Sequence, residues 1–206
     1  MIKTIIFDWS GVIKDCIDDQ LFVVNKIFEK FGASTISLQE FIDNWVQPYM
    51  VFYNKYLPDL TLEQEQLAYK KAIADCPPAH AYPGIVDEIK RLKNNGIKMV
   101  VVSSDFPETL YLEISLFSLE DIFVDIATNA HDKTAAIKEL IDKNNFNKLE
   151  TIIIGDSNHE IEAGKIAGIK TMGVTWGFTK EDNIISANPD FVAHNLAEFK
   201  DVLNNN

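Results

Sequence analysis

Cysteine is scarce in this sequence: Cys16 and Cys76 are the two cysteines among 206 residues. Neither belongs to a Cys-x-x-Cys pair, and no group of cysteines and histidines has the spacing of a zinc site. A disulfide framework and a structural zinc ion are therefore excluded as sources of stability. We expect both thiols to be reduced and to behave as small apolar side chains.

Long apolar runs are also missing. The first run, residues 5–7, is too short for the core of a secretory signal and is followed at once by Asp8. No stretch approaches the roughly 20 apolar residues that a membrane-spanning helix needs. The sequence therefore predicts a cytoplasmic protein that has no membrane partner.

Basic residues are few, with 19 Lys and Arg against 31 Asp and Glu and a formal net charge of −12. A surface this acidic repels a phosphate backbone, which argues against nucleic acid as a partner. An anionic small substrate would need a local positive site or a bound cation. Hydrophobic residues nevertheless make up 47% of the chain, enough for the core of one domain with a modest insertion.

The sequence does contain a regular alternation of short apolar runs and longer helical patterns. The runs are rich in β-branched residues and bounded by polar or turn residues, as buried parallel strands are. They occupy residues 5–7, 99–102, 122–124, 152–154 and 172–174, and the helical patterns lie at about 84–95, 107–117, 133–145 and 159–167. This alternation predicts an α/β fold with a doubly wound, Rossmann-like parallel sheet covered by helices on both faces.

The alternation is interrupted between about residues 15 and 80, where no strand pattern occurs. Apolar residues recur there at three- and four-residue steps, as they do on amphipathic helices. The helical patterns cover residues 21–31, 41–49 and 62–73. We predict a small all-helical cap domain, inserted after the first strand of the core. The predicted boundaries are 15–81 for the cap and 1–14 plus 82–206 for the core.

Polar side chains follow several of the predicted strands, at the strand ends where open parallel sheets bind ligands. Asp8 comes directly after the first run, Ser103 and Ser104 after the second, and Asp156 closely after the fourth. Lys133 stands at the start of a helical pattern between them. Two carboxylates, a hydroxyl and several loop amides are thus predicted to meet at one edge of the sheet, with the Lys133 ammonium available beside them.

These pieces resemble the motifs of the haloacid dehalogenase-like superfamily of aspartate-nucleophile phosphatases. The matching pieces, in family order, are Phe7-Asp8-x-Ser10-Gly11-Val12-x-x-Asp15, Val102-Ser103, Lys133, Ile154-Gly155-Asp156-Ser157-x-x-Glu160, Ala167-Gly168-Ile169 and Gly173-Val174-Thr175-Trp176-Gly177. The resemblance covers nearly the whole chain and is weakest in the helical insertion. The chain looks most like the phosphoglycolate phosphatase-like branch, whose members carry a helical cap in the same place.

The resemblance implies a magnesium-dependent phosphatase that acts on a small phosphorylated metabolite. Asp8 is the implied nucleophile and forms an aspartyl-phosphate, which splits one difficult step into two easier ones. The implied Mg²⁺ ligands are Asp8, the backbone carbonyl of Ser10 and Asp156. Lys133 would pair with the nucleophile and the transferring group, and Glu160 would orient Lys133 or contact the metal through water. The implied substrate-binding residues are Ser103, Ser104 and Gly11.

The sequence departs from the family pattern at Ser10, a catalytic position. The phosphatases usually carry a second aspartate there, which protonates the leaving group and then activates water. A serine hydroxyl does not titrate near neutral pH, and losing a general acid and base costs roughly 10² to 10⁴ in rate. The metal site is less affected, because the family uses only the backbone carbonyl at this position.

Three interpretations follow from Ser10. In the first, the chain is a phosphatase whose leaving group departs easily, or whose acid comes from elsewhere, such as Asp15 or a cap residue. In the second, it binds phosphorylated ligands without turning them over.

In the third interpretation, the Asp8-Trp9-x-Gly11 pattern is similar to that of phosphonoacetaldehyde hydrolases, which cleave a C–P bond through a Schiff base on a cap lysine. The cap lysines available for this are Lys26, Lys30, Lys55, Lys70 and Lys71, with no clear match to the lysine motif of those enzymes. The sequence identifies neither the substrate nor the oligomeric state.

Overall fold

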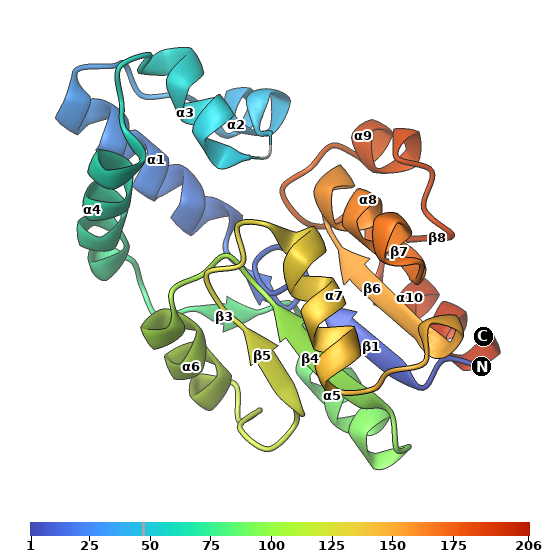
Figure 1. Ribbon diagram of the computed structural model, residues 1–206. Coiled ribbons are helices and arrows are strands. Elements are labelled where there is room, and N and C mark those ends of the chain that lie inside the picture. Colours follow the sequence, from blue (N-terminus) through green and yellow to red (C-terminus); the bar gives the residue numbers. More distant parts are fainter. Residues whose placement is uncertain (47) are drawn as a thin grey trace.

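The centre of the computed structural model, which describes residues 1–46 and 48–206, is a six-stranded parallel sheet (Figure 1). Its strand order is β5-β4-β1-β6-β7-β8, so β1 lies between β4 and β6. The strands are β1 (Thr4–Phe7), β4 (Lys98–Val102), β5 (Asp125–Ala127), β6 (Thr151–Gly155), β7 (Lys170–Val174) and β8 (Phe191–Ala193). The predicted doubly wound parallel sheet is confirmed.

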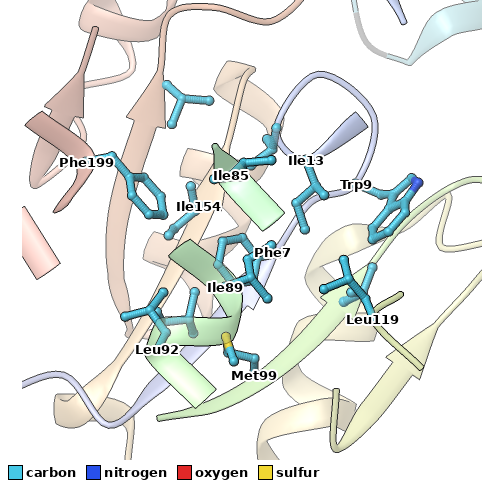
Figure 2. Close-up of a cluster of buried hydrophobic side chains, with 14 of the residues drawn as sticks. Phe7, Trp9, Ile13, Ile85, Ile89, Leu92, Met99, Leu119, Ile154 and Phe199 are labelled. Atoms are coloured by element: carbon cyan, nitrogen blue, oxygen red, sulfur yellow. The ribbon is translucent and has the colours of Figure 1, made fainter. Parts of the chain in front are cut away.

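Neighbouring residues of the central strand pack against helices on opposite faces of the sheet. Phe7 lies in a buried cluster with Phe199 (Figure 2), whereas Ile6 packs with Ile137 and Ala163. Because helices cover both faces, the inner strands are mostly apolar beyond their first residues. The core helices are α5 (Ile85–Asn94), α6 (Pro107–Leu116), α7 (Lys133–Lys143), α8 (Asn158–Ala167), α9 (Glu181–Ser186) and α10 (Leu196–Asn205), with a 3₁₀ turn at Lys148–Glu150.

One strand lies three residues beyond its predicted place. The prediction for residues 122–124 was wrong, because this run precedes β5, and Ile122 and Phe123 pack against the cluster of Figure 2 instead. β5 is an edge strand and only half-buried. A polar residue is therefore tolerated within it, and Asp125 accepts a hydrogen bond from Asn144 at 2.9 Å.

The helices between the first two core strands pack into a second apolar cluster, which Phe178 of the core also joins. Val24, Phe28, Phe41 and Phe52 are buried there, and Figure 1 shows these helices beyond the upper end of the sheet. The helices are α1 (Ile17–Phe31), α2 (Leu38–Asn44), α3 (Tyr49–Tyr56) and α4 (Leu62–Ala72), followed by a 3₁₀ turn at Ile73–Asp75. Short antiparallel strands, β2 (Lys14–Asp15) and β3 (His80–Ala81), pair where the chain leaves and re-enters the core.

The helical pattern over residues 41–49 is divided in the structure. Helix α2 ends at Asn44, and Pro48 directly precedes α3. Proline has no N–H and clashes with the preceding helical turn. Pro48 therefore prevents α2 from continuing, and it is tolerated directly before the first residue of α3. Gln47, which falls within the predicted pattern, lies outside the described residues.

Both cysteines are free thiols in the structure, as expected. Burial raises the pKa of the Cys16 thiol above its usual value, so this thiol stays protonated near neutral pH. None of the described helices combines the length and the apolar character needed to cross a bilayer.

Candidate active site

Asp8 stands at the end of the central strand, in a fixed loop. Its N–H donates to the carbonyl of Ile154 on β6 at 2.9 Å, and its Oδ1 accepts the N–H of Trp9 at 2.8 Å. The indole of Trp9 is fully buried, stacks on Phe117 and donates to Glu113 at 2.7 Å. The large side chain beside Asp8 therefore anchors the loop and holds the carboxylate in one place.

Lys133 reaches Asp8 from the first turn of α7. Asp132 caps this helix by accepting the N–H of Ala135, which fixes where the helix begins. The Lys133 ammonium lies 2.8 Å from Asp8 Oδ2 and 2.5 Å from Glu160 Oε1, and the side chain is buried. Burial lowers the pKa of Lys133, but the two carboxylates outweigh it, and the net pKa lies above its usual value.

Glu160 is held at both of its oxygens. While Oε1 accepts from Lys133, Oε2 accepts the backbone N–H of Ser157 at 3.0 Å and the Ser157 hydroxyl at 2.5 Å. This contact is one half of a capping box at the start of α8. Burial raises the pKa of Glu160, but Lys133 and Ser157 outweigh it and the net pKa is lowered. The geometry therefore favours a carboxylate that orients Lys133.

Asp156 follows β6 and is enclosed by backbone. Its Oδ2 accepts the N–H of Phe178 at 2.6 Å. A Cβ atom on Gly11 would lie 2.3 Å from this oxygen, and one on Gly177 would lie 2.2 Å from it. Gly11 also has φ of +85°, which strains any other L-residue. Glycine at both positions lets the backbone close around the carboxylate.

The carboxylates of Asp8, Asp156 and Glu160 gather closely, each offering an oxygen within 4.8 Å of the others. Burial, together with Glu160 and Asp8, raises the pKa of Asp156 well above its usual value. Burial also raises the pKa of Asp8 to about 7, although Lys133 acts in the opposite direction. Lys133 supplies one positive charge among three carboxylates, so a further cation fits this set of oxygen donors.

A cleft between the sheet edge and helices α1–α4 collects most of the predicted site residues. Its core side includes Asp8, Ser10, Ser103, Ser104, Lys133, Asp156 and Glu160, and its helical side includes Trp45, Tyr49, Tyr53, Glu65 and Tyr69. Gly11 packs against Asp156 and is not one of the cleft-lining residues. Asp15 is likewise absent from the described lining and lies 3.5 Å from His80 at the β2–β3 pair.

Asp105 is one of the cleft residues that the sequence analysis did not identify. Asp105 accepts the hydroxyl of Ser10 at 2.9 Å and the hydroxyl of Ser103 at 3.0 Å, both on Oδ2. Its position in the sequence could have identified Asp105, because it lies two residues after Ser103 in the same loop following β4. The structure thus brings a third aspartate to the sheet edge beside Ser10.

Comparison with known proteins identifies the family of this chain. The family model of haloacid dehalogenase-like hydrolases matches residues 5–174. The chain is 24% identical to the pyrophosphatase PpaX of Halalkalibacterium halodurans, covering 98% of this chain and 97% of that protein. It is 23% identical to a phosphoglycolate phosphatase of Synechococcus elongatus, covering 92% of each.

Two solved structures have the same fold. A putative haloacid dehalogenase-like hydrolase from Bacteroides fragilis superposes with a TM-score of 0.86 at 16% identity, covering 97% of this chain and 100% of that one. A predicted phosphatase from Clostridium acetobutylicum superposes with a TM-score of 0.84 at 20% identity, covering 99% of each chain.

Proposed function

The chain belongs to the haloacid dehalogenase-like hydrolases, and we propose that it is a magnesium-dependent phosphatase of small phosphorylated metabolites that uses Asp8 as its nucleophile. The observation that carries the proposal is the position of Asp8. Its carboxylate lies in the cleft, 2.8 Å from the Lys133 ammonium and close to the acidic cluster with Asp156. Phosphatase names among the similar proteins support it.

Magnesium fits the donor set at this sheet edge. Asp8, Asp156 and the backbone carbonyl of Ser10 would hold the ion, because hard oxygen ligands are those that Mg²⁺ prefers. Both oxygens of Glu160 are already bound by protein groups, which leaves this residue to position Lys133. The ion would neutralise the charge of the phosphoryl group as a carboxylate approaches it.

The remaining chemistry follows from the protein groups. An oxygen of Asp8 forms a bond to phosphorus as the ester P–O bond breaks, and the leaving oxygen takes up a proton. Lys133 stabilises the charge on the transferring group, and the Ser104 hydroxyl donates a hydrogen bond to it, joined by the Ser103 hydroxyl once that group turns away from Asp105. Water then attacks phosphorus, which releases phosphate and regenerates the Asp8 carboxylate.

Residues 15–81 would act as a cap domain over the core of 1–14 and 82–206. Support comes from the apolar cluster that helices α1–α4 form, with Phe178 as its one buried member from the core segment, and from the paired strands at the junction. Aromatic side chains of this segment, among them Trp45 and Tyr49, line the cleft and would exclude water from the reaction.

The C–P cleavage alternative finds no support in the cleft. A Schiff base needs a lysine that can lose its proton. The lysines of the described lining are Lys14 and Lys133, and each is ion-paired with a carboxylate. None of the five cap lysines is among the described lining residues.

Metal dependence tests the proposal. We expect the protein to hydrolyse 4-nitrophenyl phosphate in the presence of Mg²⁺, and we expect chelation by EDTA to lower the rate by about 10²-fold or more, because the phosphoryl charge is then left without its main counter-charge. Excess Mg²⁺ should restore the rate. An unchanged rate after chelation, or no hydrolysis once Mg²⁺ binding is demonstrated by calorimetry, would contradict the proposal.

A further inference from the structure

The Asp156 carboxylate is held in the structure by a single backbone group. Among the described residues, the N–H of Phe178, which donates to Oδ2 at 2.6 Å, is the one hydrogen-bond donor to this carboxylate. By contrast, Asp8 and Glu160 are each bound both by Lys133 and by a backbone N–H. Phe178 belongs to the loop between β7 and α9 (Figure 1). The orientation of Asp156 therefore depends on where this loop places one N–H.

The side chain of Phe178 determines the position of that N–H. The preceding residue is Gly177, and glycine restricts the backbone less than any other residue. The Phe178 ring is 7% exposed, and a Cβ atom on Gly11 would lie 3.1 Å from its Cδ2. The ring is thus packed against the turn that follows Asp8. A shift of the ring would move the N–H that holds Asp156.

Helix α2 packs against the same ring from the helical side of the cleft. Phe41 meets it edge to face, with ring centroids 6.4 Å apart, and Trp45, directly after the helix, lies 6.0 Å from it. Two residues after Phe178, Lys180 forms an ion pair with Asp43 of the same helix at 2.5 Å. Helix α2 therefore contacts this part of the loop at two points.

The beginning of the loop is held by the core instead. The indole of Trp176 donates to the carbonyl of Val12 at 3.3 Å, and its carbonyl accepts the hydroxyl of Tyr82 at 2.8 Å. Trp176 also packs against the buried cluster of the core. The loop is thus bound to the core at Trp176 and to α2 from Phe178 onward, and the N–H that holds Asp156 lies on the part bound to α2.

We propose that Phe178 is a positioning residue for Asp156, through which the packing of α2 sets the affinity of the site for Mg²⁺. The role rests on the proposed function, in which Asp156 is a ligand of the ion. Groups that hydrogen-bond a metal-binding carboxylate fix its orientation, and changing them typically lowers metal affinity about 10- to 100-fold. Phe178 acts on the ion through Asp156.

Coupling between two sites works in both directions. If contacts with α2 favour the orientation of Asp156 that binds the ion, then the bound ion favours the packing of α2 by the same free energy. We therefore expect Mg²⁺ to slow amide hydrogen exchange within Leu38–Asn44 in wild type. In Phe178→Leu this protection should be weaker, because the ring that joins the two sites is gone.

Calorimetric titration with Mg²⁺ tests the role in two variants. Phe178→Leu keeps the N–H and an apolar side chain but loses the aromatic contacts with α2. Phe41→Leu changes the partner ring, which is fully buried and is not among the described residues that line the cleft. We expect each variant to raise the dissociation constant for Mg²⁺ about tenfold or more. At saturating Mg²⁺, kcat for 4-nitrophenyl phosphate should stay near the wild-type value, because the occupied site keeps the same ligands.

Phe28→Leu is the matched control. Phe28 is fully buried in the same apolar cluster, and its aromatic partners among the described residues all belong to α3. The substitution should lower the melting temperature in EDTA about as much as Phe41→Leu does. Its dissociation constant for Mg²⁺ should stay within about twofold of wild type, because it shares no contact with Phe178.

Three results would overturn the inference. One is an unchanged Mg²⁺ affinity in both Phe178→Leu and Phe41→Leu, and another is an equal loss of affinity in Phe28→Leu, which would trace the effect to general destabilisation. The third is hydrogen exchange in α2 of wild type that does not respond to Mg²⁺. The proposed function fails separately, if wild type itself binds no Mg²⁺ or binds it without hydrolysing 4-nitrophenyl phosphate.

Discussion

Asp8→Asn should abolish turnover of every phosphate ester, with a loss of about 10⁴-fold or more in kcat, as is typical when a covalent nucleophile is removed. Asparagine has nearly the same shape and keeps an oxygen for the N–H of Trp9. Its amide is too weak a nucleophile to form the phosphoryl bond. Steady-state hydrolysis of 4-nitrophenyl phosphate with Mg²⁺ measures the loss.

When both proteins are free of metal, the Asp8→Asn protein should be at least as stable as wild type. Burial raises the pKa of Asp8 to about 7, so ionising this carboxyl costs free energy in the folded protein. A neutral amide removes that cost near neutral pH. Thermal unfolding in EDTA therefore serves as the control, and a clear fall in melting temperature would point to misfolding as the cause of lost activity. An active Asp8→Asn protein would exclude Asp8 as the nucleophile.

Lys133→Met should impair both stability and catalysis. Its ammonium lies 2.8 Å from Asp8 and 2.5 Å from Glu160, so the substitution leaves buried carboxylates without their shared counter-charge. Removing one partner of a buried ion pair typically costs about 3–5 kcal/mol, which urea unfolding would measure. We also expect kcat to fall about 10²- to 10³-fold, because the charge on the transferring group loses its stabilisation.

Two variants control this experiment. Lys138→Met replaces an exposed lysine on the same helix and should change neither quantity. Adding Glu160→Gln to Lys133→Met removes one of the uncompensated charges and should recover part of the stability without recovering the rate. If Lys133→Met unfolded at the wild-type urea concentration and kept its kcat, the ammonium would have neither role.

The sequence was most informative where chain position alone determines geometry. Strands buried on both faces are short apolar runs, and the residues directly after them must lie at one edge of a parallel sheet. Asp8, Ser103 and Asp156 could be brought together on that basis. Lys133 follows a loop and not a strand, but Asp132 caps the helix there, and the ammonium reaches Asp8 from the first turn of that helix.

Other features had no local signature. The bond between Ser10 and Asp105 joins residues far apart in the sequence, and neither the periodicity nor the motif of either loop implies it. The edge strand β5 is half-buried, so its residues lack the apolar pattern that marked the inner strands, and the neighbouring run of residues 122–124 was mistaken for it. Gly11 was predicted to bind substrate because of its motif, whereas the structure places it against Asp156.

The pairing of β2 with β3 has a consequence for how such proteins diversify. Lys14 pairs with Ala81 and Asp15 with His80, so the chain departs and returns at adjacent points, roughly 5 Å apart as opposed residues of an antiparallel pair are. A helical module of another length or shape can be exchanged between these two points without altering the register of any core strand. Selection for a new substrate can therefore rebuild the helical side of the cleft while Asp8, Lys133 and Asp156 stay in place.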